Sequence, residues 1–246
     1  MVELGENERN CALFLDIDGT LIDVAAAPDC VIVPMELPPL LARLAASLDG
    51  ALAIVTGRPI LDVDRFLAPQ RFIVAGVHGA ELRLAPDGAI QSRAEPLDPA
   101  LIAAIAQLVQ LDPGVIVELK QFSIAVHYRM APAARLRIAA ELQKILDSGP
   151  DHLILCKGRA VFEVVPKHIS KGGAIDVLLQ LPVFRGRRPI MIGDDISDLS
   201  AFEAVVRHGG LALRVAGEHF PRDMAEFDGP AHVRTWLSDL AKRLEE

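Results

Sequence analysis

The sequence predicts an α/β protein in which a parallel sheet with helices on both faces is interrupted by a smaller α+β module. Near both ends of the chain, short continuous apolar runs alternate with segments of helical apolar spacing. The middle instead holds pairs of alternating stretches that follow each other closely. At 246 residues and 51% hydrophobic composition, the chain is long enough for a core domain that carries an insertion.

The first element of the expected parallel sheet is the run Cys-Ala-Leu-Phe-Leu at residues 11–15, which ends at charged residues. A strand that is buried on both faces has this pattern. Further strands are expected at 51–55, 72–75, 190–192 and 210–215, and helices at 37–48, 60–66, 172–181 and 198–207.

The middle of the chain has a different period. A helix at 99–111 precedes stretches at 115–120 and 122–128, which are joined too closely for a crossover helix and therefore predict a hairpin. A second helix and strand pair follow at 132–146, 153–156 and 160–165. We expect a core domain formed by residues 1–92 and 167–246, an inserted domain at 93–166, and hinges near 92–98 and 166–170.

Composition and charge exclude several classes of protein. The net charge of −8 and the scattered Lys and Arg residues argue against nucleic acid as a partner. Cys11, Cys30 and Cys156 form no CxxC pair, which argues against a disulfide framework and a zinc site. Because no apolar run reaches the roughly 18 residues that span a bilayer, we expect a soluble cytoplasmic protein with no membrane association. We also expect a monomer.

The strongest chemical signal is Asp-Ile-Asp-Gly-Thr-Leu at residues 16–21, directly after the first buried strand. Ligands of open parallel sheets bind at the carboxyl ends of the strands, so Asp16 and Asp18 are expected at the active-site edge. A carboxylate can attack phosphorus, and a second one can act as general acid and base. The alternative interpretation is an Asp-rich turn.

A second acidic segment, Gly-Asp-Asp-Ile-Ser-Asp at 193–198, follows the apolar run 189–192. Carboxylates that meet an anionic phosphate need a cation, and hard oxygen ligands favour Mg²⁺. Ordinary capping of a helix N-terminus by acidic residues is the alternative, but it does not explain a second aspartate cluster after a second buried strand.

The residues at 16–21 match the DxDGT[LV] signature of the haloacid dehalogenase superfamily, and the chain resembles that superfamily. Thr56-Gly57-Arg58, Lys171 and the acidic segment at 193–198 follow in the order of its other motifs. The resemblance implies a Rossmann-like core in which Asp16 forms an aspartyl-phosphate and Asp18 is the general acid and base.

The same resemblance implies roles for the remaining core residues. Mg²⁺ would be bound by Asp16, the backbone carbonyl of Asp18 and Asp194, with Asp198 acting through water. Thr56, Gly57 and Arg58 would contact the transferring phosphoryl group. Lys171 would screen the charges of nucleophile and phosphate.

Three polar residues of the inserted module lie on expected strands. Glu118 and Lys120 share one face of their strand, and Glu163 interrupts the apolar run 160–165. Carboxylates and ammonium groups form charge-assisted hydrogen bonds with hydroxyl groups, so these residues are interpreted as a sugar-binding set. An exposed Lys120 that pairs with Glu118 is the alternative.

The pattern around these residues resembles trehalose-6-phosphate phosphatases over nearly the whole chain. It comprises Glu118-x-Lys120-x-x-Ser123-x-x-x-His127-Tyr128-Arg129, with Gly76-x-His78-Gly79-Ala80-Glu81 upstream and Lys157-Gly158-x4-Glu163-x2-Pro166 downstream. The resemblance implies a cap domain of the C2B type, in which Glu118, Lys120 and Glu163 hold the glucose unit remote from the phosphate. His78, His127 and Arg129 are further candidates for substrate binding.

One position departs from that family's pattern, and other functions stay open. The usual GDDxTDE reads Gly-Asp-Asp-Ile-Ser-Asp-Leu here, so Leu199 removes a carboxylate. The alternatives are a phosphatase for another sugar phosphate, such as sucrose 6-phosphate or mannosyl-3-phosphoglycerate, a phosphomutase, and a catalytically silent sugar-phosphate sensor.

Overall fold

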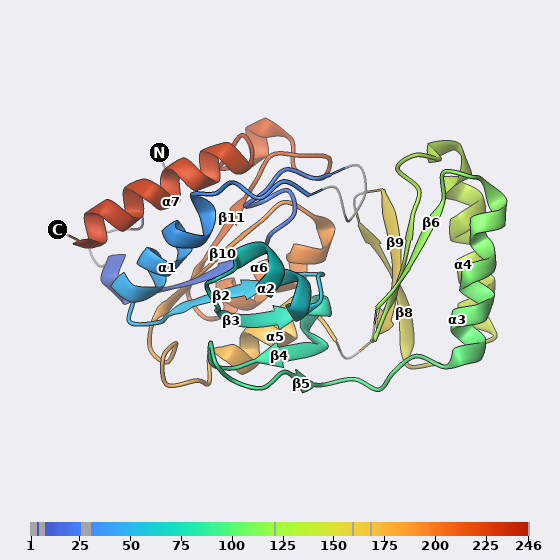
Figure 1. Ribbon diagram of the computed structural model, residues 1–246, viewed down its shortest axis with the longest axis horizontal. Coiled ribbons are helices and arrows are strands. Elements are labelled where there is room, and N and C mark those ends of the chain that lie inside the picture. The colour runs from blue at the N-terminus through green and yellow to red at the C-terminus, as the bar shows by residue number, and fades with distance from the viewer. Residues whose placement is uncertain are drawn as a thin grey trace. The chain divides into compact units, whose positions relative to one another are not determined.

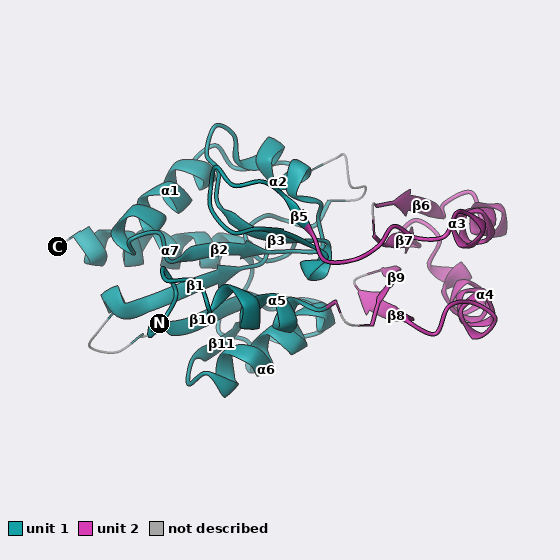
Figure 2. Cartoon of the chain, turned by 90° about the horizontal axis from the view of Figure 1, so that it is seen from below, with its two compact units in different colours: residues 1–91, 170–246 teal, residues 92–169 magenta. Residues whose placement is uncertain are grey.

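A computed structural model of the chain describes residues 4, 8–25, 31–120, 122–158, 160–167 and 169–245 (Figure 1). The chain forms two compact units, residues 1–91 with 170–246 and residues 92–169 (Figure 2). We call them the core unit and the inserted unit. Their roles in catalysis and in sugar recognition stay predictions.

The core unit is built on a sheet of order β11-β10-β1-β2-β3-β4-β5. Neighbouring strands from β11 to β3 are parallel, so the predicted α/β class with a largely parallel sheet is confirmed. The short strand β4, which was not predicted, runs antiparallel to β3. The strands are β1 Cys11–Leu15, β2 Leu52–Val55, β3 Ile73–Gly76, β4 Glu81–Arg83, β5 Gln91–Ser92, β10 Arg188–Gly193 and β11 Leu211–Arg214.

Helices cover both faces of this sheet, as predicted (Figure 2). Helices α1 (Leu37–Ser47) and α2 (Ile60–Leu67) lie on one face, and α5 (Lys171–Leu178) and α6 (Leu199–Arg207) lie on the other. Because all residues of β1 and β2 are buried between these layers, their sequences are continuously apolar. The C-terminal helix α7 (Pro230–Glu245), which was also not predicted, packs against α1.

The inserted unit contains an antiparallel sheet of order β6-β7-β9-β8. The two predicted strand pairs, β6 with β7 and β8 with β9, are both antiparallel. The predicted first helix ends early and continues as a 3₁₀ turn, Gln107–Leu111. The elements are α3 Pro99–Ala106, β6 Ile116–Leu119, β7 Ile124–His127, α4 Arg135–Asp147, β8 Leu153–Gly158 and β9 Val161–Pro166.

The two faces of this smaller sheet differ in character. One face packs against α3 and α4 through a buried cluster that includes Ile124, Phe162 and Val164. Strand register places Glu118 opposite Ala125, Ala125 opposite Glu163, and Glu163 opposite Cys156. Because side chains alternate between faces, this row lies on the face opposite the helices, which we call the polar face.

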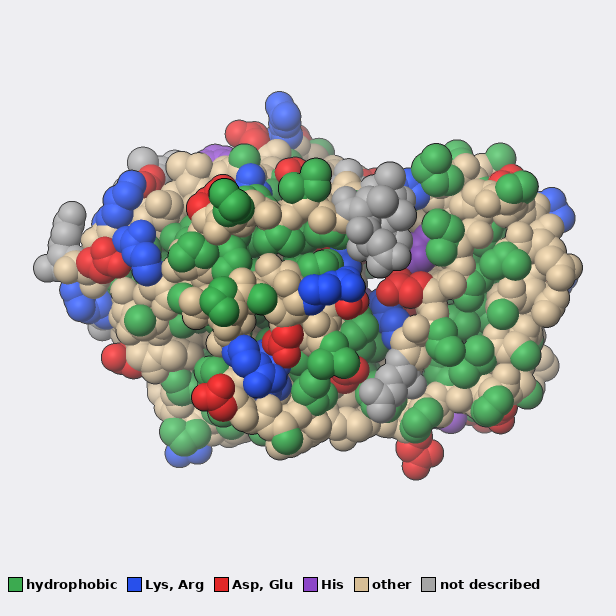
Figure 3. All heavy atoms as spheres, viewed as in Figure 1, with side chains coloured by type: hydrophobic (Ala, Val, Ile, Leu, Met, Phe, Trp, Pro, Cys, Tyr) green, Lys and Arg blue, Asp and Glu red, His purple; other side chains and the backbone are tan. Residues whose placement is uncertain are grey.

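The surface of the described residues shows no patch of one charge on the face drawn in Figure 3, where acidic and basic side chains are interspersed. Within the described ranges, no helix is long and apolar enough to cross a membrane. Cys11 and Cys156 carry free thiols, and Cys30 lies outside the described residues.

Candidate active site

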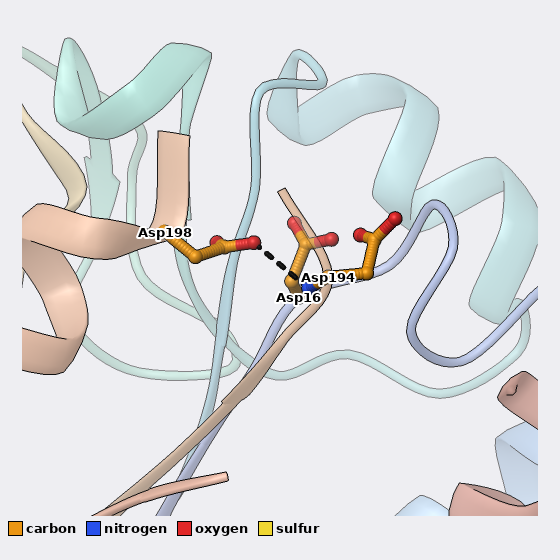
Figure 4. A group of neighbouring side chains, drawn as sticks. All are labelled: Asp16, Asp194 and Asp198. Carbon is orange, nitrogen blue, oxygen red and sulfur yellow. Dashed lines mark hydrogen bonds between the residues drawn. The ribbon is translucent and has the colours of Figure 1, made fainter. Parts of the chain in front are cut away.

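Three aspartates from separate segments meet at one edge of the core sheet. Asp16 follows β1, Asp194 follows β10, and Asp198 ends the 3₁₀ turn Ile196–Asp198. The strands β1 and β10 are neighbours, and the Asp16 N–H donates to the carbonyl of Ile192 at 3.1 Å. Carboxylate oxygens of the three aspartates lie within 4.8 Å of one another, and we call them the acid cluster (Figure 4).

Lys171 joins two members of this cluster. Its Nζ donates to Asp16 Oδ1 at 2.7 Å and to Asp198 Oδ1 at 2.6 Å, and all three side chains are buried. The Ser170 hydroxyl caps α5 by accepting from the Gly173 N–H at 3.0 Å, so Lys171 is the first residue of the helix. Burial alone would lower the pKa of Lys171, but the charges of Asp16 and Asp198 outweigh it and raise the pKa above its ordinary value.

The acid cluster carries more negative charge than Lys171 compensates. Burial raises the pKa of Asp16 to about 7 despite the attraction of Lys171, and Asp198 adds to the increase. Burial and repulsion from Asp16 and Asp198 raise the pKa of Asp194 to about 9. Carboxylates that resist ionisation in this way are stabilised by a divalent cation.

The donor set of the acid cluster fits Mg²⁺, since carboxylate oxygens are its preferred protein ligands. Gly19, with φ of +82°, makes room for one of them. A Cβ atom at this position would lie 2.0 Å from Asp194 Oδ2, so a side chain there would displace the carboxylate. The glycine of the predicted motif is therefore required both by backbone conformation and by close approach.

Asp198 has more contacts than its predicted water-mediated role suggested. Its Oδ2 accepts from the Asp194 N–H at 3.1 Å (Figure 4). The same oxygen accepts from the Asp195 N–H at 3.0 Å, while Oδ1 accepts from Lys171. One buried carboxylate thus orients both the lysine and the backbone that carries Asp194. The spacing of Asp195 and Asp198, which form a capping box, was the available sequence signal.

The carboxylate of Asp18 binds Arg58. Arg58 Nε donates to Oδ2 at 2.5 Å and its terminal nitrogen donates to Oδ1 at 2.6 Å, while the guanidinium lies 4.7 Å from the ring centroid of Phe66. The motif predicts a contact between Arg58 and the phosphoryl group, and this pair was not predicted. Bidentate geometry of this kind fixes the orientation of a carboxylate.

The loop that carries Thr56, Gly57 and Arg58 rests on the segment after β3. The His78 N–H donates to the Thr56 carbonyl at 3.0 Å, and a Cβ on Gly57 would lie 2.8 Å from the His78 ring. The Thr56 hydroxyl accepts from the Arg58 N–H at 3.2 Å. Glu81, the first residue of β4, accepts from the Ile60 N–H at 2.8 Å and so caps the start of α2.

The candidate residues of the inserted unit form two pairs on its polar face. Lys120 Nζ lies 2.8 Å from Glu163 Oε1, and His127 Nε2 lies 2.9 Å from Glu118 Oε2. Burial raises the pKa of Glu118, but the hydrogen bond with His127 and the charge of Lys120 outweigh it, and the net pKa is lowered. Arg129 is half-buried in the turn after β7.

The sequence model of the trehalose-phosphatase family matches residues 14–232, a range that contains every candidate residue from Asp16 to Asp198. The chain belongs to this family. Over 216 residues it is 44% identical to a probable trehalose-phosphate phosphatase of Sinorhizobium fredii, covering 84% of this chain and 78% of the relative. Over 255 residues it is 34% identical to the trehalose-6-phosphate phosphatase of Escherichia coli, covering 100% and 92%.

Solved structures of trehalose-phosphatase relatives share the fold. The C-terminal domain of C. albicans trehalose-6-phosphate phosphatase matches with a TM-score of 0.82 at 20% identity, covering 96% of each chain. A trehalose-6-phosphate phosphatase related protein matches with a TM-score of 0.68 at 25% identity, covering 94% of this chain and 97% of the other. The predicted resemblance to this family is confirmed.

Proposed function

We propose that the protein hydrolyses trehalose 6-phosphate to trehalose and inorganic phosphate with Mg²⁺ as cofactor. The observation that carries the proposal is the buried Asp16, hydrogen-bonded by Lys171 within the acid cluster of a chain that belongs to the trehalose-phosphatase family. Both curated relatives described above are named as phosphatases of trehalose phosphate.

The proposed reaction has two displacements at phosphorus. Asp16 attacks the phosphoryl group, the bond from phosphorus to the sugar oxygen breaks, and Asp18 gives that oxygen a proton. Asp18 then removes a proton from a water molecule as the water attacks the aspartyl-phosphate. The bond from phosphorus to Asp16 breaks, which releases phosphate and regenerates both carboxyl groups.

Asp18 also contacts Arg58. Both of its oxygens accept hydrogen bonds from Arg58, and each oxygen keeps a second lone pair that can carry a proton. To act as the acid, Asp18 has to direct one of these oxygens toward the oxygen of the leaving sugar. In this proposal Arg58 orients Asp18 between turnovers and contacts the phosphoryl group with Thr56 and Gly57, beside His78.

Bound Mg²⁺ would supply positive charge that offsets the phosphoryl oxygens. Asp16, Asp194 and the backbone carbonyl of Asp18 would hold it, and Asp198 would act through water. Lys171 Nζ lies 2.7 Å from Asp16 Oδ1, so it orients that oxygen and favours its ionised form for attack.

The polar face of the inserted unit would bind the sugar. Glu118, Lys120 and Glu163 would donate to and accept from hydroxyl groups of the glucose unit remote from the phosphate, with His127 and Arg129 nearby. The core residues are also compatible with other sugar phosphates, so the choice of trehalose 6-phosphate depends on these residues and on family membership.

The test is phosphate release from a panel of sugar phosphates with and without Mg²⁺. We expect turnover that needs Mg²⁺, a preference for trehalose 6-phosphate, and loss of turnover in Asp16→Asn. Retained turnover in Asp16→Asn would remove the nucleophile assignment. A preference for sucrose 6-phosphate or mannosyl-3-phosphoglycerate would overturn the substrate assignment, and dependence on a bisphosphate activator would indicate a phosphomutase.

A further inference from the structure

A buried serine of the inserted unit contacts one of the residues assigned to the sugar. The hydroxyl of Ser123 donates to Glu163 Oε1 at 2.7 Å, and Lys120 Nζ donates to the same oxygen at 2.8 Å. The side chains of Glu163 and Lys120 are 8% and 9% exposed, and Ser123 is fully buried. Two donors therefore meet on one oxygen of a largely buried carboxylate.

The position of Glu163 makes such support necessary. It lies on β9, a central strand, and its direct cross-strand neighbours are Ala125 and Cys156. A glutamate has three rotatable side-chain bonds, and small neighbours such as these restrict few of its rotamers. A carboxylate that has to meet a sugar hydroxyl at hydrogen-bond distance needs a fixed direction, and the two donors on Oε1 provide it.

The hydroxyl of Ser123 is a polar group in a fully buried residue. A buried hydroxyl costs free energy unless it forms a hydrogen bond, and this one bonds Glu163. The Lys120 N–H donates to the Ser123 carbonyl at 2.9 Å, which holds the two donors together at the end of the β6–β7 hairpin. The backbone bond holds Ser123 and Lys120 together, and their side chains converge on Glu163.

We propose that Ser123 is a positioning residue for sugar selectivity, which acts by holding Glu163 in the orientation that accepts a hydrogen bond from the substrate. The proposal rests on the proposed function, because it assigns a support to one of the residues that would bind the sugar. Ser123 itself need not touch the substrate.

The test is a double-mutant cycle between Ser123→Ala and Glu163→Ala, read as kcat/KM for trehalose 6-phosphate and for p-nitrophenyl phosphate. Loss of a hydrogen bond to a charged group should lower kcat/KM for the disaccharide phosphate by about tenfold in Ser123→Ala. The value for p-nitrophenyl phosphate, which has no sugar, should change by less than about twofold. In the Glu163→Ala background, Ser123→Ala should cause no further loss.

Two further variants separate positioning from a general effect on the fold. Ser148→Ala removes a hydroxyl that caps the end of α4 and should leave both substrates unaffected. Ser123→Cys keeps a weak donor of similar size and should give intermediate selectivity, and it takes the place of Ser123→Ala in the cycle if the alanine variant does not fold.

The outcomes distinguish this proposal from the proposed function. An equal decrease in kcat/KM for both substrates in Ser123→Ala would overturn the role of Ser123. Decreases that add in the double variant would overturn it as well. A parent chain that prefers another sugar phosphate would overturn the substrate assignment alone, and the cycle would then be measured with that preferred substrate.

Discussion

Asp198→Asn should destabilise the core unit, because this buried carboxylate serves three donors with two oxygens. It accepts from Lys171 on one oxygen and from two backbone N–H groups on the other. An asparagine amide has one oxygen, so its NH₂ group would face either the ammonium group or the backbone donors. In either orientation of the amide, Lys171 or the two backbone N–H groups would lose their acceptor.

The magnitude follows from two opposing effects. Removing one partner of a buried ion pair lowers the free energy of unfolding by about 3–5 kcal/mol. Asp16 still pairs with Lys171, and removing a negative charge also relieves the repulsion that raises the pKa values of Asp16 and Asp194, so we take the lower end. A loss of about 3 kcal/mol corresponds to a decrease in Tm of roughly 6–12 °C for a chain of this size.

Thermal unfolding followed by the fluorescence of Trp236 measures this change, since the single tryptophan is buried in the core unit. The experiment is done at pH 7.5 without Mg²⁺. The matched control is Asp239→Asn, which breaks an exposed 2.7 Å pair with Lys242 and should leave Tm within about 1 °C. An Asp198→Asn variant that also unfolds within about 2 °C of the parent would refute the reasoning about shared acceptors.

Three other measurements test further parts of the site. Arg58→Ala should lower kcat on both sugar and aryl phosphates by about tenfold or more, because it removes the bidentate contact to Asp18. As a control, Arg65→Ala removes an exposed cation over the same Phe66 ring and should leave kcat unchanged. Burial and the charge of Glu163 raise the pKa of the Cys156 thiol to about 11, so Glu163→Gln should lower this pKa yet leave it above its ordinary value. The pH dependence of alkylation, in a chain without the other two cysteines, would measure this pKa, and an unchanged value would contradict the prediction. Without Mg²⁺, the folded acid cluster holds protons that an unfolded aspartate releases near pH 4, so the free energy of unfolding should fall as pH rises from about 4 to 9. Because Mg²⁺ displaces these protons, the increase in Tm on adding Mg²⁺ should grow over pH 6 to 9. An increase in Tm that is constant over this range would show that no proton is displaced.

The sequence was sufficient to predict where the carboxylates of Asp16 and Asp194 lie, but not which residues the neighbouring carboxylates contact. Continuous apolar runs mark strands buried on both faces, so the amino-acid pattern alone assigned Asp16 and Asp194 to strand ends. The pairing of Asp18 with Arg58 depends on how the loop after β2 rests on the segment after β3. Contacts of that kind join residues about 40 positions apart, and no local pattern encodes them.

The elements β4 and α7 were not predicted, and the sequence signal differs between them. Strand β4 is only three residues long, Glu-Leu-Arg, and its buried Arg83 pairs with Asp64, so it lacks an apolar signature. Helix α7 does carry helical spacing, with Val233, Trp236 and Leu237 among its buried positions, and that spacing is sufficient to predict it. The sequence thus carries a signal for α7 that the prediction did not use, whereas it carries no such signal for β4.

The charge content of the two sets of residues supports their proposed division between two parts of one substrate. The acid cluster has three carboxylates against one ammonium group, so the proposed approach of a phosphate would require a cation. On the polar face, Glu163 pairs with Lys120 and Glu118 is hydrogen-bonded with His127, so each carboxylate has a partner within the inserted unit, as the proposed binding of a neutral sugar requires. Lowering Mg²⁺ should consequently slow trehalose 6-phosphate and p-nitrophenyl phosphate by the same factor, whereas variants of the polar face should separate the two rates. If Mg²⁺ removal changed the selectivity as well, the division between a phosphate set and a sugar set would be wrong.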